Sequence, residues 1–159
     1  IETPTHWITM GADPNLNQAL AILLDETAKF LSEQRGISTD AARRLIPQVS
    51  DCRIAEVVNQ SKMLYCMNAK DWKILKLPAL AARETPRNFI TVGEDPDLQR
   101  AMDTASMSMI EVLQQKKGLT RLDAYSLASL TMDCRLGNPT AEVQRVHCFV
   151  AKSLWVKKN

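Results

Sequence analysis

The chain repeats itself at an offset of 82 residues, and this repeat constrains the fold more than any other feature of the sequence. The offset places Glu2-Thr3-Pro4 on Glu84-Thr85-Pro86 without a gap. It also places residues 51–53 (Asp-Cys-Arg) on residues 133–135, which have the same sequence. About 20 identities fall over roughly 70 aligned positions, many of them at turn and cap residues. The chain therefore holds two copies of one unit of about 80 residues.

Each copy begins with a strand signal and then a helix signal. Residues 6–10 are mainly β-branched or aromatic and lie between Pro and Gly, which predicts a strand. Asp13-Pro14 predicts a helix N-cap with proline at the first helical position. Leucines then recur at helical spacing until Gly36, which predicts a left-handed helix end. The second copy carries the same signals at the equivalent positions.

The rest of each copy predicts one helix and two strands. In the first copy the helix ends near Val49, residues 53–58 alternate as a strand does, and residues 63–67 form a second, apolar strand. In the second copy, residues 137–139 (Gly-Asn-Pro) interrupt the first of these two strands. The sequence thus predicts an α+β fold of two β-α-α-β-β repeats packed about a pseudo-twofold axis.

Three segments divide the chain: a first repeat at 1–72, a connector at 73–83 and a second repeat at 84–159. The connector lacks a Gly/Ser tract and is rich in Leu and Ala, so we expect it to be buried. We expect the two repeats to form one compact body.

Composition argues against two classes of partner. Lysines and arginines number 20 against 18 acids, the net charge is +2, and aromatic residues make up 5% of the chain. Nucleic-acid binding needs basic and stacking side chains in excess of this, so we expect no nucleic-acid partner. Apolar stretches such as residues 19–24 are too short to cross a bilayer, so we expect no membrane partner.

The cysteines and the first residue lead to two expectations about location. The four cysteines favour reduced thiols packed in a cytoplasmic protein, and they leave disulfides open. The chain starts at Ile1 without the features of a signal peptide, which indicates a processed or excised start.

Polar residues that recur in both copies are the natural candidates for chemistry. An Asp and an Arg two positions apart share a face on a strand but not at a helix end. Such a pair is either a structural ion pair or cap at the helix-strand junction, or a source of acid-base chemistry. A lysine that closes each repeat either binds an anion or carbonyl oxygen or is solvated. We favour the structural interpretation in both cases. The catalytic candidates are Asp51, Arg53, Lys70, Asp133, Arg135 and Lys152.

Other reactive side chains form no such pattern. His6 aligns with Asn88 and His147 aligns with Tyr65, so a duplicated metal site is excluded, and we expect no metal or cofactor within this chain. Tyr125 and Ser129 share a helix face, where we favour packing over a serine nucleophile. The three neighbouring methionines favour core packing; they are Met102, Met107 and Met109.

With these elements in place, the chain resembles the C-terminal module of the acetamidase/formamidase family of amidohydrolases, present here twice. The second copy resembles the family more closely than the first, because residues 41–47 of the first copy have lost the family's Ala-Tyr-x-Leu-x-Ser pattern. Both copies have Ala where the family has Pro before the last lysine. The stretches that carry the resemblance are 7–16, 118–120 (Gly-Leu-Thr), 123–129, 132–136 (Met-Asp-Cys-Arg-Leu) and 146–152.

The resemblance implies hydrolysis of short-chain amides such as formamide and acetamide to a carboxylate and ammonia. In the family the module occurs once, after a β-rich N-terminal portion that holds most of the catalytic and metal-binding groups. The resemblance therefore implies a scaffold and oligomer-interface role for this chain, with a divalent metal belonging only to a complete family enzyme. The implied partners are other copies of the chain or a β-rich N-terminal partner chain, together with a small amide substrate. The alternative is a non-catalytic assembly or binding protein derived from the same module.

Overall fold

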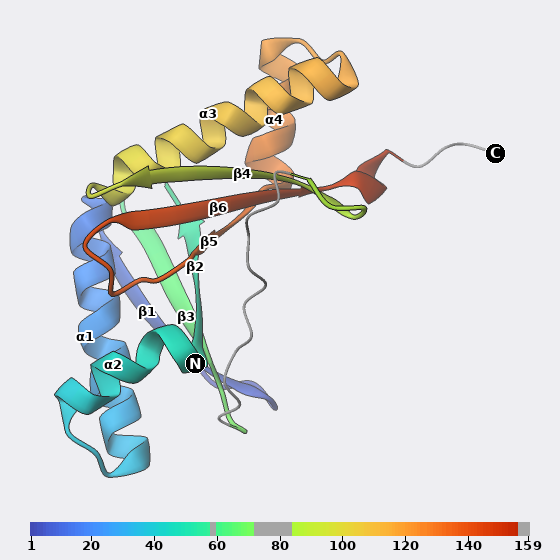
Figure 1. Cartoon of the computed structure of the whole chain (residues 1–159). Helices are drawn as coiled ribbons and strands as arrows, with labels where there is room; N and C mark the ends of the chain where they lie inside the picture. The colour runs from blue at the N-terminus through green and yellow to red at the C-terminus, as the bar shows by residue number, and fades with distance from the viewer. Residues whose placement is uncertain (58–59, 72–83, 156–159) are drawn as a thin grey trace.

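The computed structural model describes residues 1–57, 60–71 and 84–155, so the connector expected at 73–83 lies outside the described residues. The same order of elements occurs twice along the chain (Figure 1). The first repeat contains β1 (His6–Asp13), α1 (Leu16–Arg35), α2 (Thr39–Val49), β2 (Ser50–Glu56) and β3 (Lys62–Ala69). The second contains β4 (Asn88–Asp95), α3 (Leu98–Lys117), α4 (Arg121–Thr131), β5 (Asp133–Leu136) and β6 (Gln144–Ala151), followed by a 3-10 turn at Lys152–Leu154.

All six strands form one antiparallel sheet in the order β1-β3-β2-β5-β6-β4. The two repeats join between β2 and β5, where Arg53 is paired with Arg135. These two residues are equivalent under the 82-residue offset, so the pseudo-twofold axis passes between them. The predicted α+β fold with repeated β-α-α-β-β order is confirmed. The short β5 also agrees with the predicted interruption at residues 137–139.

The long helices begin two residues later than the sequence pattern predicts. The N-cap of α1 is Asn15, whose side chain accepts hydrogen bonds from the backbone of the first helical turn. Asp13 instead accepts from the backbone N–H of Asn15 at 2.8 Å, which places Pro14 in a turn before the cap. The predicted N-cap at Asp13 is therefore wrong, whereas the left-handed helix end at Gly36, with φ of 64°, is confirmed.

Glycines let each long helix lie directly on the first strand of its repeat. A Cβ atom on Gly93 would lie 1.9 Å from the backbone oxygen of Ala101, and one on Gly11 would lie 2.2 Å from that of Ala19. The absence of a side chain therefore permits the contact of α1 with β1 and of α3 with β4. Both helices cover the same face of the sheet, and α2 and α4 pack against them (Figure 1).

One apolar layer between the sheet and the long helices spans both repeats. It contains leucines of α1, residues of α3 and the cysteines of the central strands. Met102 and Met109 are buried as predicted, but Met107 is exposed. Met107 and Met109 are two positions apart on a helix and cannot both face the same core, so the expectation of core packing is wrong for Met107.

The cysteines form two disulfides, and the expectation of reduced thiols is wrong. Cys52 is bonded to Cys66 across β2 and β3, and Cys134 is bonded to Cys148 across β5 and β6. Each pair is directly opposed in the strand register, which brings the two sulfur atoms together. The bridges are equivalent in the two repeats, and both lie in the buried layer.

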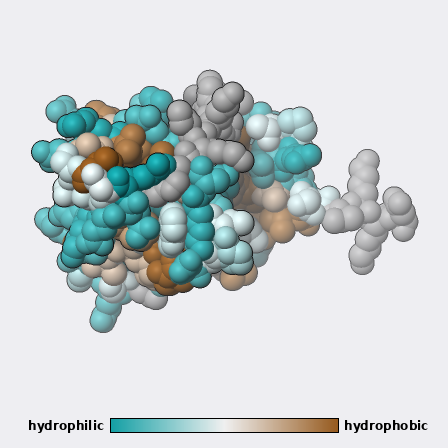
Figure 2. Space-filling model, turned by 90° about the horizontal axis from the view of Figure 1, so that it is seen from below, coloured by the Kyte–Doolittle hydropathy of each residue, from teal (hydrophilic) through white to brown (hydrophobic). Residues whose placement is uncertain are grey.

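The surface is of mixed character on the side seen from below in Figure 2. Hydrophilic residues cover much of that face, and hydrophobic residues appear as separate areas between them (Figure 2). None of the helices in the described part of the chain has the length and apolar character that crossing a bilayer requires.

Candidate functional site

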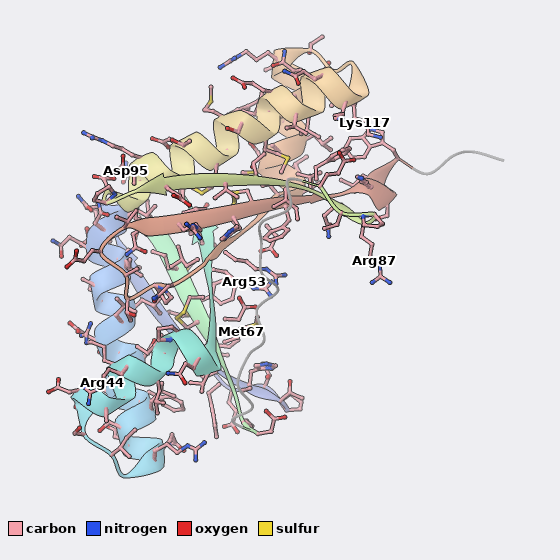
Figure 3. All side chains as sticks on the ribbon, in the orientation of Figure 1. Arg44, Arg53, Met67, Arg87, Asp95 and Lys117 are labelled. Carbon is pink, nitrogen blue, oxygen red and sulfur yellow. A yellow bond between two sulfur atoms is a disulfide. The ribbon has the colours of Figure 1, made fainter. Side chains whose placement is uncertain are left out.

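Four of the six catalytic candidates meet where the two repeats join. Along β2 the side chain of Cys52 points into the buried layer, so Asp51 and Arg53 point to the other face of the sheet. Figure 3 shows Arg53 and Met67 on the side of the sheet away from α1 and α2. The pairing of β2 with β5 then brings the equivalent pair of the second repeat alongside. We call Asp51, Arg53, Asp133 and Arg135 the seam quartet.

Each arginine of the seam quartet donates two hydrogen bonds to the aspartate of its own strand. Arg53 donates from Nε and Nη2 to Oδ2 of Asp51 at 3.0 and 2.7 Å. Arg135 donates from Nε and Nη2 to Oδ2 of Asp133 at 3.1 and 3.0 Å. The sequence leaves open whether Asp51 and Arg53 lie on a strand or at a helix end; the structure places both on β2, where they share a face.

The quartet also connects the two repeats. Arg53 donates from Nη1 to Oδ2 of Asp133 at 3.3 Å, and Nη1 of Arg135 lies 3.9 Å from Oδ2 of Asp51. Positive and negative groups therefore alternate across the seam. Asp51 is the most enclosed of the four, with 14% of its side chain exposed.

The carboxylates favour the charged form of the Arg53 guanidinium group. Burial by itself lowers the pKa of Arg53, but the hydrogen bond and charge of Asp51, together with the charge of Asp133, outweigh burial and raise that pKa above its ordinary value. Two cations and two anions leave the quartet neutral. A carboxylate that already accepts charge-assisted hydrogen bonds is a weak general base, so this arrangement suits cohesion better than acid-base chemistry.

The two candidate lysines lie at strand ends and pair with glutamates. Lys70 forms an ion pair with Glu2, and its Nζ lies 5.4 Å from the centre of the Trp7 ring. Lys152 donates to Glu84 at 2.5 Å. These contacts tie the last strand of each repeat to the segment before its first strand. The structure therefore places the lysines in two equivalent pairs of their own.

His147 lies next to the seam quartet, and the sequence pattern does not single it out for this position. It is paired with Arg135 across β5 and β6 and is only 4% exposed. Its Nδ1 atom is buried without a hydrogen-bond partner. Burial, reinforced by the charge of Arg145, lowers the pKa of this imidazole and favours its neutral form. The cross-strand neighbours that create this environment come from register, so only tertiary pairing reveals it.

His6 is not part of this group. It lies on β1 at the edge of the sheet, where its Nδ1 is 2.8 Å from the hydroxyl of Thr5. Within the described ranges, no three His, Cys, Asp or Glu side chains are arranged to hold a metal ion.

Helix α4 places Tyr125 and Ser129 on its outer side, so the expectation that they pack within the chain is wrong. The buried residues of α4 are Ala124 and Ala128, and they define the inner side of the helix. Both Tyr125 and Ser129 are exposed, and the Ser129 hydroxyl donates to the backbone oxygen of Tyr125 at 2.9 Å. A serine with that hydrogen bond and no paired base is not activated as a nucleophile.

A groove of about 750 Å³ runs between the edge strand β1 and helix α1. Its walls combine aromatic and charged side chains, including Trp7, Phe30, Glu26 and Lys29. None of the six catalytic candidates lines this groove. The groove and the seam quartet are therefore separate features of the surface.

Comparison with models of protein families, with curated proteins and with solved structures gives no match to this chain.

Proposed function

We propose that the chain is a scaffold and assembly module of the kind found at the C-terminal end of acetamidase/formamidase amidohydrolases, and that it does not hydrolyse amides alone. The seam quartet carries this proposal. Its carboxylates and guanidinium groups are engaged with one another across the junction of the two repeats. Amide hydrolysis needs a base for water and a donor for the leaving nitrogen, and a neutral, mutually paired quartet is poorly suited to either task.

The position of the quartet at the junction of the two repeats supports a structural role for it. The register of β2 with β5 pairs Arg53 with Arg135 and Ile54 with Cys134, so the junction between the repeats is short. Charge-assisted hydrogen bonds on the face opposite the helices strengthen this junction where few backbone pairs are available. In a complete family enzyme, a β-rich partner portion would supply the catalytic groups, any divalent metal and the site for the small amide.

A non-catalytic assembly or binding protein derived from the same module is the second candidate. The exposed apolar side chains of α4 favour it, because they are unneeded for the fold of one chain and suit a contact with another. Both candidates assign assembly to this chain. They differ in whether a catalytic partner exists.

Ammonia release tests the proposal. We expect the purified chain to release no ammonia from formamide or acetamide above the buffer rate, with or without added Mg²⁺, Mn²⁺ or Zn²⁺. Release that persists in a Ser126→Ala control but disappears in Asp133→Asn would show that the quartet is catalytic and would refute the scaffold proposal.

The sequence and the structure favour different cellular compartments for this chain. The sequence analysis favours the cytoplasm, whereas two buried disulfides favour folding in an oxidising compartment. We propose the oxidising compartment. Thiol titration of denatured protein isolated from its source distinguishes them, since a cytoplasmic protein would show four free thiols and the proposal expects none.

A further inference from the structure

The outer side of α4 carries several large apolar side chains although it faces solvent. Leu130 is 84% exposed and Leu122 is 73% exposed, and Tyr125 is also exposed. Residues 124–132 contain no charged side chain, whereas the exposed Arg121 and Asp123 flank Leu122 in the first turn of the helix. Exposed leucines are common singly, but three large apolar residues on one short helix form a patch that calls for an explanation. We call Leu122, Tyr125, Ser126, Ser129 and Leu130 the outer α4 face.

The first repeat provides an internal comparison, because α2 has the same length and the same place in the fold as α4. The outer α4 face has polar or charged counterparts on α2 at four of its five positions. Figure 3 shows one of them, Arg44, projecting from α2 away from the sheet. The fold therefore does not require apolar residues at these positions. The α2 residues equivalent to the outer α4 face are Asp40, Arg43, Arg44, Pro47 and Gln48.

The same contrast extends to the neighbouring long helix. In the first repeat, Arg43 of α2 forms an ion pair with Asp25 of α1. The equivalent residues of the second repeat are Tyr125 and Met107, and both are exposed. An ion pair that suits a solvated helix face is thus replaced by two apolar side chains, which enlarge the apolar patch.

We propose that the outer α4 face binds the outer α4 face of a second copy of this chain, which gives a twofold-symmetric dimer. A twofold contact presents one patch to itself, and an uncharged patch can do so without opposing like charges. Contact of the same patch with α2 of another copy would instead bury Arg43 and Arg44 without partners on α4, which is costly. This inference goes beyond the proposed function and does not rest on it.

The shape and size of the patch fit such a contact. Ser126 and Ser129 lie between the larger side chains, so leucine and tyrosine side chains of one helix can enter the shallow region of the other. A helix of this length spans about 16 Å. The patch therefore buries well under the roughly 800 Å² per partner of a standard stable interface. We expect a weak dimer that forms in the micromolar range of protein concentration.

Sedimentation velocity over about 1 to 500 µM tests the dimer. The wild-type chain is expected to shift from the monomer mass to twice that mass. Leu130→Gln and Tyr125→Arg are each expected to raise the dissociation constant at least about tenfold. Both substitutions introduce the residue found at the equivalent position of the first repeat, so we expect the fold to tolerate them. Arg44→Ser on α2 is the matched control and should leave the dissociation constant unchanged.

Cross-linking tests the geometry even if one of these variants fails to fold. Ser126 lies at the centre of the patch, so Ser126→Cys should form a disulfide between two copies, whereas Arg44→Cys should not. A monomer at every concentration would overturn the proposal, and would leave a different protein as the occupant of the patch. A dimer that Tyr125→Arg and Leu130→Gln leave intact would also overturn it.

Discussion

Arg53 and Arg135 are directly opposite each other on β2 and β5, although both side chains are positively charged. Like charges at directly opposed positions of a sheet are destabilising on their own. Here Asp133 accepts hydrogen bonds from the arginines of both strands, whereas Asp51 accepts them from Arg53 and lies within ion-pair distance of Arg135. The carboxylates therefore offset the repulsion between the two opposed arginines at this short junction.

Asp51→Asn should lower the free energy of unfolding by about 1 to 3 kcal/mol, because it leaves two partly enclosed guanidinium groups with one carboxylate. Urea denaturation at neutral pH measures the change. Asp25→Asn is the matched control, since it removes an exposed ion pair on the helix surface and should cost less than about 1 kcal/mol. Equal losses in the two variants would contradict a special role for the quartet.

Gly93→Ala should destabilise the chain far more than Gly36→Ala. The added Cβ at Gly93 would meet the backbone oxygen of Ala101, so α3 must move off the sheet, and we expect a loss of at least about 3 kcal/mol. At Gly36 the space is open and only the positive φ is unfavourable, so about 1 to 2 kcal/mol is expected. Thermal unfolding of the two variants in the same buffer tests which substitution is more destabilising. Similar melting temperatures for the two variants would refute the prediction.

Removal of one disulfide should cost about 2 to 4 kcal/mol, because each bridge closes a loop with a sequence separation of 14. We expect the Cys52→Ala/Cys66→Ala and Cys134→Ala/Cys148→Ala double variants to lose similar amounts, since the bridges are equivalent. Melting with and without a reductant measures the effect. If complete reduction of both disulfides left the wild-type melting temperature unchanged, the predicted stabilisation by the disulfides would be wrong.

Stability should fall as the pH falls below about 6.5, because burial lowers the pKa of His147 in the folded chain. The unfolded chain then binds the proton first, so this contribution is fully present above the unfolded pKa and is lost toward acid. Arg135 faces the ring from β5, and Arg145 and Glu94 are further charged neighbours. His147→Tyr introduces the residue found at the equivalent position of the first repeat. Urea unfolding at pH 5, 6, 7 and 8 gives the free energy of unfolding as a function of pH. We expect this free energy to change less with pH in the variant than in the wild type. An equal pH dependence in both proteins would show that His147 is not its source.

The order of elements was predictable because each signal is local. Helix periodicity and the glycine at the end of each long helix act within a few residues, and the repeat tests every signal twice. Even so, the helix start was misplaced, because Asn15 competes successfully with Asp13 for the capping position. Local patterns establish that a helix exists more firmly than where it begins.

The sequence by itself determined the duplication, the α+β class and the order of helices and strands in each repeat. Only the tertiary structure decided that β2 meets β5, that the cysteines pair across neighbouring strands, and that Tyr125 faces outward. Strand periodicity states which residues share a face but not which strand lies alongside. In α4, whose charged residues are confined to its first turn, helix periodicity does not show which side meets the core. Those choices depend on contacts between separate elements, within one repeat for the cysteine pairs and between the two repeats for β2 and β5.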